Sequence, residues 1–492
     1  MIATPKVDWF ALAPTLALLG ASGVALLGAV LVPAWLRRAF TAFVAFGGFV
    51  TAGVLAALVF DRSAESRELL VQTMTRDRLG ALAAIIVAGA GAIAVLVSWG
   101  ERRRDHEGEY YALLTAAGAG MVFFVTASNL MTLFLGLEWF SIALYILCAL
   151  DTHRATSLEA GLKYLVVGSF GSAILLFGSA LVYGATGELG FSAIASATVE
   201  DDYLRLAGLA LIITGLGFKA SAAPFHMWTP DVYQGAPTSV TAFMSAATKV
   251  AALVLTMRIL VVAFPDQEHL WTVAVAVVAV VSLAVGNFAA LVQRDVKRLL
   301  AYSSVSHAGF MLIAIAVNTE FGGRALLYYL IPYSAMSIGA FAVVAARERE
   351  LGAPVTLDSL SGFGWERPFL GVAMWIFMLG FMGLPLTGGF VGKFYVFSAA
   401  YEAGWWWLVL AGVAATAVSL YYYLNVIRAM YMRPEDLKSG VELRPAIAGG
   451  SPPRDPLLAS AVAASVGVTV GSFVFVQPLI ELARDATASL PF

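Results

Sequence analysis

Cysteine and charge are both scarce in this chain. Its 492 residues include one cysteine, Cys148, and only 13% are charged, with a formal net charge of −2. A single thiol cannot hold an iron–sulfur cluster or a zinc ribbon, because each needs several thiolate ligands. A nearly neutral chain also lacks the basic excess typical of nucleic-acid-binding proteins. We therefore expect no cofactor and no metal in this chain, and no nucleic-acid partner.

Long polar segments are missing as well, whereas hydrophobic residues make up 60% of the chain. A helix that crosses the hydrocarbon core needs about 20 apolar residues, and such runs follow one another almost from end to end. The first run is too long for a secretion signal, so we interpret it as a retained helix. The sequence predicts an all-α polytopic membrane protein, with residues 1–492 as a single transmembrane domain.

Hydropathy predicts about fourteen transmembrane helices, of which the seventh and the twelfth are broken. The expected spans are residues 10–33, 39–60, 79–99, 110–127, 129–150, 160–183, 204–223, 238–263, 270–291, 297–317, 324–346, 368–400, 404–430 and 456–482. Odd-numbered loops hold seventeen Lys and Arg residues, whereas the even-numbered loops and the two tails hold eight. The positive-inside rule then places the odd loops in the cytoplasm and both termini on the outer, periplasmic side.

Prolines and glycines interrupt two of the spans. After Lys219 the chain reads ASAAPFHMWTPDVYQGAPT, and before Lys393 it reads GLPLTGGFVG. Such breaks at membrane depth persist only where protein packs them or where they line a polar cavity, and paired breaks are typical of inverted repeats in transporters. We therefore expect N-terminal helices 1–3 over residues 1–109, a first five-helix repeat (helices 4–8) over 110–263, a second, inverted repeat (helices 9–13) over 270–431, and helix 14 over 456–482.

Ionisable residues inside the spans are the main functional signal. Lys163, Lys219, Lys249, Lys393 and Glu138 lie in stretches that otherwise read as membrane-spanning helices. A charge at mid-bilayer costs roughly 2.5–3.5 kcal/mol on insertion scales, and such residues face the bundle interior and mark ion pathways. Burial lowers the proton affinity of a lysine and a nearby carboxylate restores it. A row of such lysines is therefore suited to relaying protons across the membrane.

Five long blocks carry a specific resemblance. They read LGLEWFSIALYILCALD, EAGLKYLVVGSFGSAILLFGSALVYGATG, GFKASAAPFHMWTPDVYQGAPT, RDVKRLLAYSSVSHAGF and GLPLTGGFVGKFYVF. In this order they resemble the antiporter-like subunits of respiratory complex I, over residues from about 110 to 430. The block FHMWTPDVYQGAPT and a lysine at position 393 are similar to the N-type subunits of bacterial NADH:quinone oxidoreductase. One difference is that the family commonly has two prolines where this chain has GLPLT.

Carried over position by position, the resemblance implies a proton relay. Glu138 and Lys219 match a charge pair at the side where protons enter the channel. Lys249 matches the lysine in the middle of the membrane, and Lys393 the residue that leads toward the outer exit. The implied activity is that of a translocase subunit without a redox centre of its own, driven by quinone reduction elsewhere in the complex.

The resemblance implies three further positions, two along the same hydrated axis (His226 and His307) and a basic one in the sixth helix (Lys163). Each also has a structural interpretation. His226 lies in the proline-rich break and is also placed to cap it. His307 has the alternative of a satisfied core histidine. Lys163 follows Glu159 by four residues, a spacing that favours a simple ion pair. Asp231, in the TPD turn, is expected to cap the next helix rather than to carry protons.

Partners and location follow from the same resemblance. FMN, iron–sulfur clusters and quinone are expected in partner subunits, and the expected neighbours are M-type, K-type, J-type and A/H-type membrane-arm subunits in the lipid bilayer. The implied location is the bacterial inner membrane. Two alternatives remain open, namely a subunit of a multisubunit cation/proton antiporter or related redox-linked complex, and a non-pumping structural spacer. Arg258, near a helix end, is expected to extend its side chain outward to the membrane surface.

Overall fold

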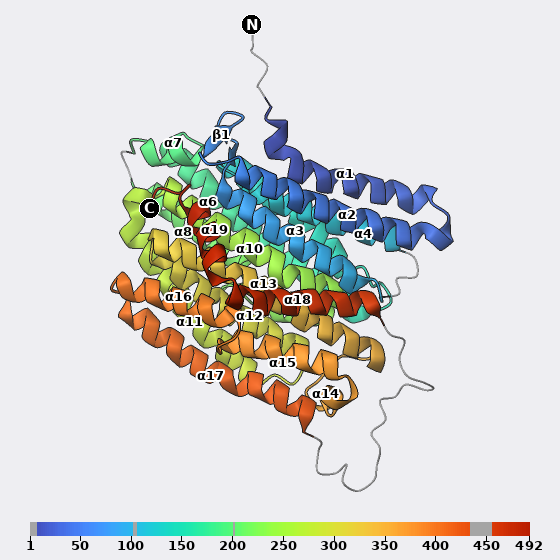
Figure 1. Cartoon of the computed structure of the whole chain (residues 1–492). Coiled ribbons are helices and arrows are strands. Elements are labelled where there is room, and N and C mark those ends of the chain that lie inside the picture. The colour runs from blue at the N-terminus through green and yellow to red at the C-terminus, as the bar shows by residue number, and fades with distance from the viewer. Residues whose placement is uncertain (1–6, 102–105, 200–201, 433–454) are drawn as a thin grey trace.

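The computed structural model describes residues 7–101, 106–199, 202–432 and 455–492, and most of them form helices that lie side by side (Figure 1). The first half contains α1 (Trp9–Leu31), α2 (Ala34–Asp61), β1 (Arg67–Leu69), β2 (Met74–Arg76), α3 (Arg78–Ser98), α4 (Glu107–Val125), α5 (Leu130–Cys148), α6 (Ala155–Thr186), α7 (Phe191–Ser196), α8 (Asp202–Lys219), α9 (Trp228–Gly235) and α10 (Thr238–Ala263). The second half contains η1 (Pro265–Gln267), α11 (Glu268–Leu291), α12 (Val296–Ala316), α13 (Glu320–Leu351), η2 (Asp358–Leu360), α14 (Phe363–Glu366), α15 (Pro368–Met382), α16 (Gly388–Glu402), α17 (Trp406–Tyr431), α18 (Pro456–Val474) and α19 (Val476–Thr487).

The predicted membrane architecture is confirmed within these residues. Twelve helical stretches are long and apolar enough to cross a membrane. The two predicted broken spans are the pairs α8–α9 and α15–α16, which bring the total to the expected fourteen. Many helix ends differ from the prediction by a few residues, because caps and long polar helix ends are invisible to hydropathy. The eleventh span, for example, is α13 and extends by several residues at each end.

The prediction for the C-terminal span was wrong in its extent. Residues 456–482 were expected to form one helix, but α18 ends at Val474 and α19 begins at Val476. Figure 1 shows α19 turning away from the direction of α18. The sequence VQPLIELARDAT alternates apolar and polar faces at helical spacing, and its buried side is Ile480, Ala483 and Ala486. An amphipathic segment of this kind packs one face on protein rather than crossing lipid.

The two helix breaks have different local geometry. The first spans residues 220–227 between α8 and α9, and contains a positive φ of 60° at Ser221. The second spans residues 383–387, with a φ of 76° at Gly383 and 74° at Leu386. Leu386 occupies the place of the family's second proline, whose ring fixes φ near −65°. This break therefore has a backbone that a second proline cannot adopt.

Two ends of the bundle can be distinguished. The β1–β2 hairpin and α7 lie at one end, here called the hairpin end, and α14 lies at the other, the α14 end (Figure 1). The described parts of the odd-numbered loops gather at the α14 end and those of the even-numbered loops at the hairpin end. Part of the charge count that motivated the sidedness lies outside the described residues, namely Lys6, Arg102, Arg103, Arg104, Arg433, Lys438, Arg444 and Arg454.

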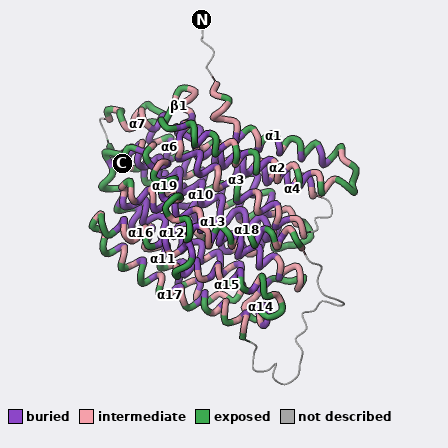
Figure 2. The backbone as a smooth tube through the Cα atoms, in the orientation of Figure 1, coloured by how far each residue is buried: buried purple, intermediate pink, exposed green. Residues whose placement is uncertain are grey.

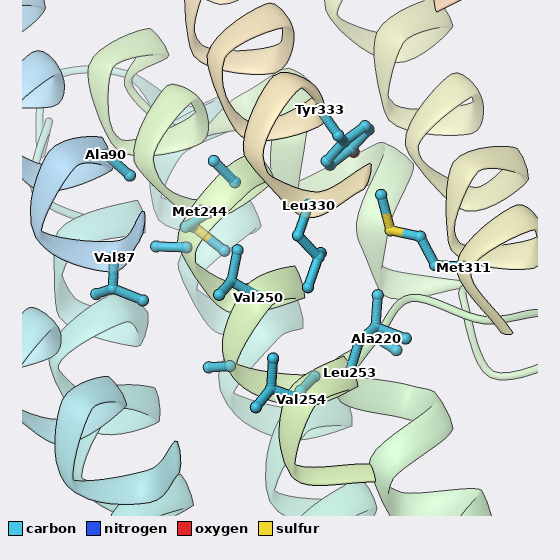
Figure 3. Close-up of a cluster of buried hydrophobic side chains, with 14 of the residues drawn as sticks. Val87, Ala90, Ala220, Met244, Val250, Leu253, Val254, Met311, Leu330 and Tyr333 are labelled. Atoms are coloured by element: carbon cyan, nitrogen blue, oxygen red, sulfur yellow. The ribbon is translucent and has the colours of Figure 1, made fainter. Parts of the chain in front are cut away.

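Burial separates central helices from peripheral ones (Figure 2). Nearly all residues of α10, α12 and α13 are buried, whereas α1, α2, α17 and α18 expose large apolar side chains such as Leu27, Phe43 and Leu410. An apolar outer surface is what lipid requires, so the central helices are the ones that can hold polar groups. Figure 3 shows their packing, with Met244, Val250, Leu253 and Val254 of α10 among side chains of α3, α12 and α13.

Arg258 does not reach the surface, so the expectation of an outward-extending side chain was wrong. Its guanidinium donates to both carboxylate oxygens of Asp77, at 2.5 and 3.0 Å, and both side chains are almost fully buried. Asp77 also caps α3 by accepting from the Gly80 amide. A two-bond guanidinium–carboxylate pair satisfies both charges inside the protein, which removes the reason to extend outward. The pair fastens α10 to the start of α3.

We predict that Arg258→Ala destabilises the fold much more than the matched change Arg78→Ala. Both residues pair with an aspartate at the hairpin end, but the Arg78–Asp485 pair is partly exposed. Breaking a buried pair costs roughly 3–5 kcal/mol, whereas exposed pairs contribute about 0–1 kcal/mol. Fluorescence-detected thermal unfolding of the purified chain in detergent provides the measurement. Equal shifts in the two variants would contradict the assignment.

Candidate functional site

Lys219 is the last residue of α8, at the first helix break, and is 2% exposed. Its Nζ donates to Ser141 Oγ of α5 at 2.6 Å. The rings of Phe140, Tyr145 and Tyr164 surround this ammonium group at 5.3 to 5.5 Å from Nζ to the ring centroid. The ammonium group is therefore held by one neutral hydroxyl and the negative faces of aromatic rings.

Glu138 does not form the expected direct charge pair with Lys219. No ion pair within 4.0 Å joins them among the described residues, and Lys219 Nζ donates to Ser141 instead. Ser141 lies one helical turn beyond Glu138 on α5 and takes the position next to the ammonium group. Glu138 Oε1 is buried and has no hydrogen-bond partner in the described part of the chain. This carboxylate oxygen is therefore buried on the same helix as the serine that contacts the lysine, without a direct bond to the lysine.

Lys249 and Lys393 both bind backbone carbonyls at the helix breaks. Lys249, on α10, is fully buried and its Nζ donates at 2.9 Å to the carbonyl oxygen of Ala220, the first residue after α8. Lys393, on α16, donates at 2.8 Å to Phe381 and at 3.3 Å to Met382, the last two residues of α15. Carbonyls at a helix C-terminus lack intrahelical partners and carry partial negative charge. An ammonium group satisfies both needs.

His307 lies on α12 in a network of hydroxyl groups. Its Nδ1 is 2.7 Å from Tyr329 Oη and its Nε2 is 3.1 Å from Tyr423 Oη. The Tyr423 hydroxyl also contacts Ser303, one turn before the histidine. The Phe310 ring centroid lies 4.4 Å from Lys393 Nζ and 6.0 Å from the centroid of the His307 ring, so both side chains are neighbours of one phenylalanine. A neutral imidazole donates from one nitrogen and accepts at the other, so this chain of bonds has two possible directions.

His226 and Lys163 are less closely tied to these groups. His226 lies in the first break beside Tyr302 of α12, with a ring separation of 6.2 Å, and its Nδ1 is buried without a partner among the described residues. Its side chain makes no capping bond to α9. Lys163 is substantially exposed and its Nζ lies 2.7 Å from both Glu159 and Asp231. The structure therefore brings Lys163 to a surface ion-pair cluster rather than to the buried lysines.

The interpretation of Asp231 as a helix cap was wrong. Its carboxylate pairs with Lys163 and, at 2.5 Å, with Arg298 of α12, and neither α9 nor α10 has a side-chain cap. These partners are 67 and 68 residues away in the sequence, so no local pattern predicts them. Asp231 joins α6, α9 and α12.

Sequence reasoning missed a fourth interior lysine. Lys297, the first residue of the expected span 297–317, was counted with the basic residues of the loop before it, but it lies in the first turn of α12 and is 1% exposed. Its Nζ donates to the carbonyl of Ala236 at 2.7 Å and to Thr238 Oγ1 at 3.0 Å, and is 3.8 Å from Glu348 Oε1. The available signal was Asp295, a capping residue that places the helix start before Lys297.

Comparison with known proteins identifies the family. The family model described as "NADH:quinone oxidoreductase/Mrp antiporter, TM" matches residues 127–419. A protein of Trichlorobacter lovleyi named NADH-quinone oxidoreductase subunit N is 41% identical over 403 residues, covering 81% of this chain and 82% of that protein. Among solved structures, a chain of respiratory complex I from Thermus thermophilus superposes with a TM-score of 0.79 at 32% identity, covering 96% of this chain and 99% of that one. A chain of the Mrp complex from Dietzia gives 0.84 at 24% identity, over 97% of each chain, a likeness of fold alone.

The fold and the buried lysines thus define a membrane protein of the antiporter-like class. The chain belongs to the NADH:quinone oxidoreductase/Mrp antiporter family. The similarity to N-type subunits that the sequence blocks indicated is confirmed by the relatives of that name, which are about 40% identical over most of their length.

We predict that Tyr423→Phe changes the hydrogen bonding of His307 and that Tyr422→Phe does not. The two neighbouring tyrosines are both buried, but only the Tyr423 hydroxyl contacts the imidazole, whereas the Tyr422 hydroxyl donates to Asn287. Removing one partner of the ring shifts its balance between the two tautomers. Nitrogen-15 NMR of histidine-labelled protein reports this balance, and an unchanged spectrum in Tyr423→Phe would refute the contact.

Proposed function

We propose that this chain is the N-type, antiporter-like subunit of a membrane-bound NADH:quinone oxidoreductase and that it moves protons across the membrane. The electron carriers, FMN and iron–sulfur clusters, and the quinone site belong to partner subunits. In this reading the α14 end faces the cytoplasm of a bacterium and both termini face the periplasm. The neighbours are the M-type, K-type, J-type and A/H-type membrane-arm subunits.

One observation carries the proposal. Lys219, Lys249 and Lys393 are almost fully buried, and each donates to a neutral oxygen rather than to a carboxylate within the described residues. A lysine paired with a carboxylate keeps its proton, whereas one held by a hydroxyl or a carbonyl can release it when a nearby charge changes. Three such groups in one bundle are suited to binding and releasing protons in turn.

Static ion pairs elsewhere in the chain provide the contrast. Lys163 has carboxylate partners at 2.7 Å, and Arg258 makes a two-bond pair with Asp77. These pairs fasten helices together, and a spacer protein would be expected to neutralise its interior lysines in the same way. Lys219, Lys249 and Lys393 have no carboxylate partner within the described residues, and burying such ammonium groups lowers the stability of the fold. Their presence therefore favours a functional role.

The assigned roles follow the position of each group. Glu138 and Lys219 form the charge-sensing end of the relay, where a change in the Glu138 environment alters the hold of Lys219 on its proton. Lys249 is the central carrier, and Lys393 passes the proton outward. His307 is assigned a role between these two lysines, with Tyr329 and Tyr423 as its hydrogen-bond partners, while His226 lies in the first break.

The energy scale suits this mechanism. Moving one charge through a 100 mV potential takes about 2.3 kcal/mol. One pKa unit corresponds to about 1.4 kcal/mol. A change of fewer than two units in the relative proton affinities of neighbouring groups therefore supplies the work. The arrival or departure of one charge next to a buried lysine is enough at low dielectric.

We predict that Lys249→Met and Lys219→Met leave a complex that assembles but loses coupled proton transfer. Methionine keeps the apolar stem and removes the ammonium group. Loss of a positioned proton carrier reduces transfer by about 100-fold or more. Proton uptake and NADH oxidation are measured in sealed membrane vesicles, with Arg324→Gln as the control, because Arg324 lies in a surface pair with Glu320.

Wild-type pumping in both lysine variants would exclude the relay and leave the spacer hypothesis. Purification in mild detergent addresses the other alternative. Flavin and iron–sulfur subunits in the purified material support the oxidoreductase, whereas their absence together with sodium-dependent proton exchange supports a cation/proton antiporter.

A further inference from the structure

The helix before the second break, α15, ends in a defined pattern of backbone hydrogen bonds. The Gly383 amide donates to the Gly380 carbonyl and the Leu384 amide to the Leu379 carbonyl, both at 3.0 Å. Gly383 has a φ of 76°, the left-handed conformation of a Schellman ending. This ending uses the carbonyl groups of the third- and fourth-last residues of the helix. The last two carbonyl groups of α15 are not used by it.

Lys393 binds these two carbonyl groups. Its Nζ donates at 2.8 Å to Phe381 and at 3.3 Å to Met382, and its side chain is buried. The centroid of the Phe310 ring lies 4.4 Å from the same Nζ, so an aromatic ring is a further partner of the ammonium group. All of these partners are neutral.

The helix before the first break, α8, ends in the same way. The amides of Ser221 and Ala222 donate to the carbonyl groups of Phe218 and Gly217 at 3.1 and 2.8 Å, and Ser221 has a positive φ of 60°. The carbonyl group of the residue before Ser221 is not used by this ending, and Lys249 Nζ donates to it at 2.9 Å. Two helix ends with one geometry therefore each hold a lysine ammonium group at the corresponding carbonyl group.

Each ammonium group lies at its break as a bound cation would. Carbonyl oxygens at a helix C-terminus carry partial negative charge. Channels and transporters bind monovalent cations with such oxygens, and in transporters they belong to broken helices. Divalent cations are instead bound largely through carboxylates. The class of ligand that suits these carbonyl groups is therefore a small monovalent cation, either an alkali metal ion or an ammonium ion.

The stem of Lys393 fills the space beside the second break. A Cβ atom added at Gly383 would lie 2.7 Å from Cδ and 3.5 Å from Cε of the lysine, so the stem passes directly over this glycine. A covalently attached stem stays in place whether or not Nζ carries a proton. Proton loss at Nζ breaks one N–H bond and leaves a neutral amine beside the carbonyl groups. The stem then still excludes another cation.

We propose that the two helix breaks are monovalent-cation sites in which a lysine side chain replaces the free ion, and that this replacement restricts the sites to protons. Without the stem, the carbonyl groups at the end of α15 bind a sodium, potassium or small ammonium ion. The inference adds ion specificity to the proposed function, and it rests on that function only for the exchange of protons at Nζ.

The test compares two variants at the same position. Lys393→Met removes the ammonium group and keeps an unbranched apolar stem in the site, whereas Lys393→Ala removes both. The purified full chain in detergent is dialysed to equilibrium against radioactive sodium ions or against radioactive rubidium ions, which stand in for potassium. The bound cations per chain are then counted for both variants and for the wild type.

We expect Lys393→Ala to bind an additional cation per chain, with Lys393→Met equal to the wild type. Methylammonium should displace this cation, whereas the bulkier choline should not. Equal binding by all three proteins would overturn the proposal. Displacement by choline would overturn it too, because attraction to exposed acidic side chains does not discriminate by size.

The first break provides a second comparison. Should Lys393→Ala not fold, Lys249→Ala against Lys249→Met decides the outcome, because Lys249 binds the corresponding carbonyl group at the end of α8. The binding measurement contains no pumping step. Equal cation binding therefore removes the ion-specificity proposal and leaves the proposed function standing, whereas wild-type pumping by Lys219→Met and Lys249→Met removes the proposed function itself.

Discussion

The structure depends on one constraint, which is that carbonyl groups freed by a helix break inside a membrane must find a donor. Lipid offers none, and each unsatisfied group costs several kcal/mol. In this chain the donors are lysine ammonium groups. Lys249 of α10 donates to the carbonyl that follows α8, and Lys393 of α16 donates to the last two carbonyls of α15. The free carbonyl groups at the breaks in turn give these ammonium groups polar partners that carry no full negative charge. Break and lysine therefore stabilise each other, and neither is explained without its partner.

The two breaks use this principle in different ways. At α15–α16 the lysine comes from the second half of the same broken helix, whereas at α8–α9 it comes from the next helix, α10. Lys219 ends the first half of its helix and turns to Ser141 on α5 instead. The sequence suggested that Lys219 and Lys393 occupy corresponding positions in two repeats. Their places relative to the breaks differ, so any repeat relation lies in the backbone course rather than in these two lysine side chains.

The sequence was sufficient for the features that depend on local composition. Apolar runs predict the helices, proline and glycine predict both breaks, and a lysine in an apolar run marks an interior position. What failed involved partners distant in the sequence. Arg258 is paired with Asp77, 181 residues away. The polar partners of Lys297 include Ala236, about 60 positions earlier, and Glu348, about 50 positions later. Lys219 donates to Ser141, 78 residues earlier on α5, and not to Glu138 of the same helix. No periodicity contains that information, since it is fixed by tertiary packing.

Buried arginines and buried lysines have different kinds of partner in this chain. Within the described residues three arginines are buried, Arg205, Arg258 and Arg347, and each pairs with at least one carboxylate. A guanidinium keeps its proton at any physiological pH, so such a pair is permanent and structural. The interior positions beside the helix breaks hold lysine instead, and their acceptors are neutral. Replacing them with arginine would preserve a donor for the carbonyls but would fix the charge. Lysine, unlike arginine, can exist in neutral form in a protein, so its use at sites whose acceptors are neutral supports the proposed role in proton transfer.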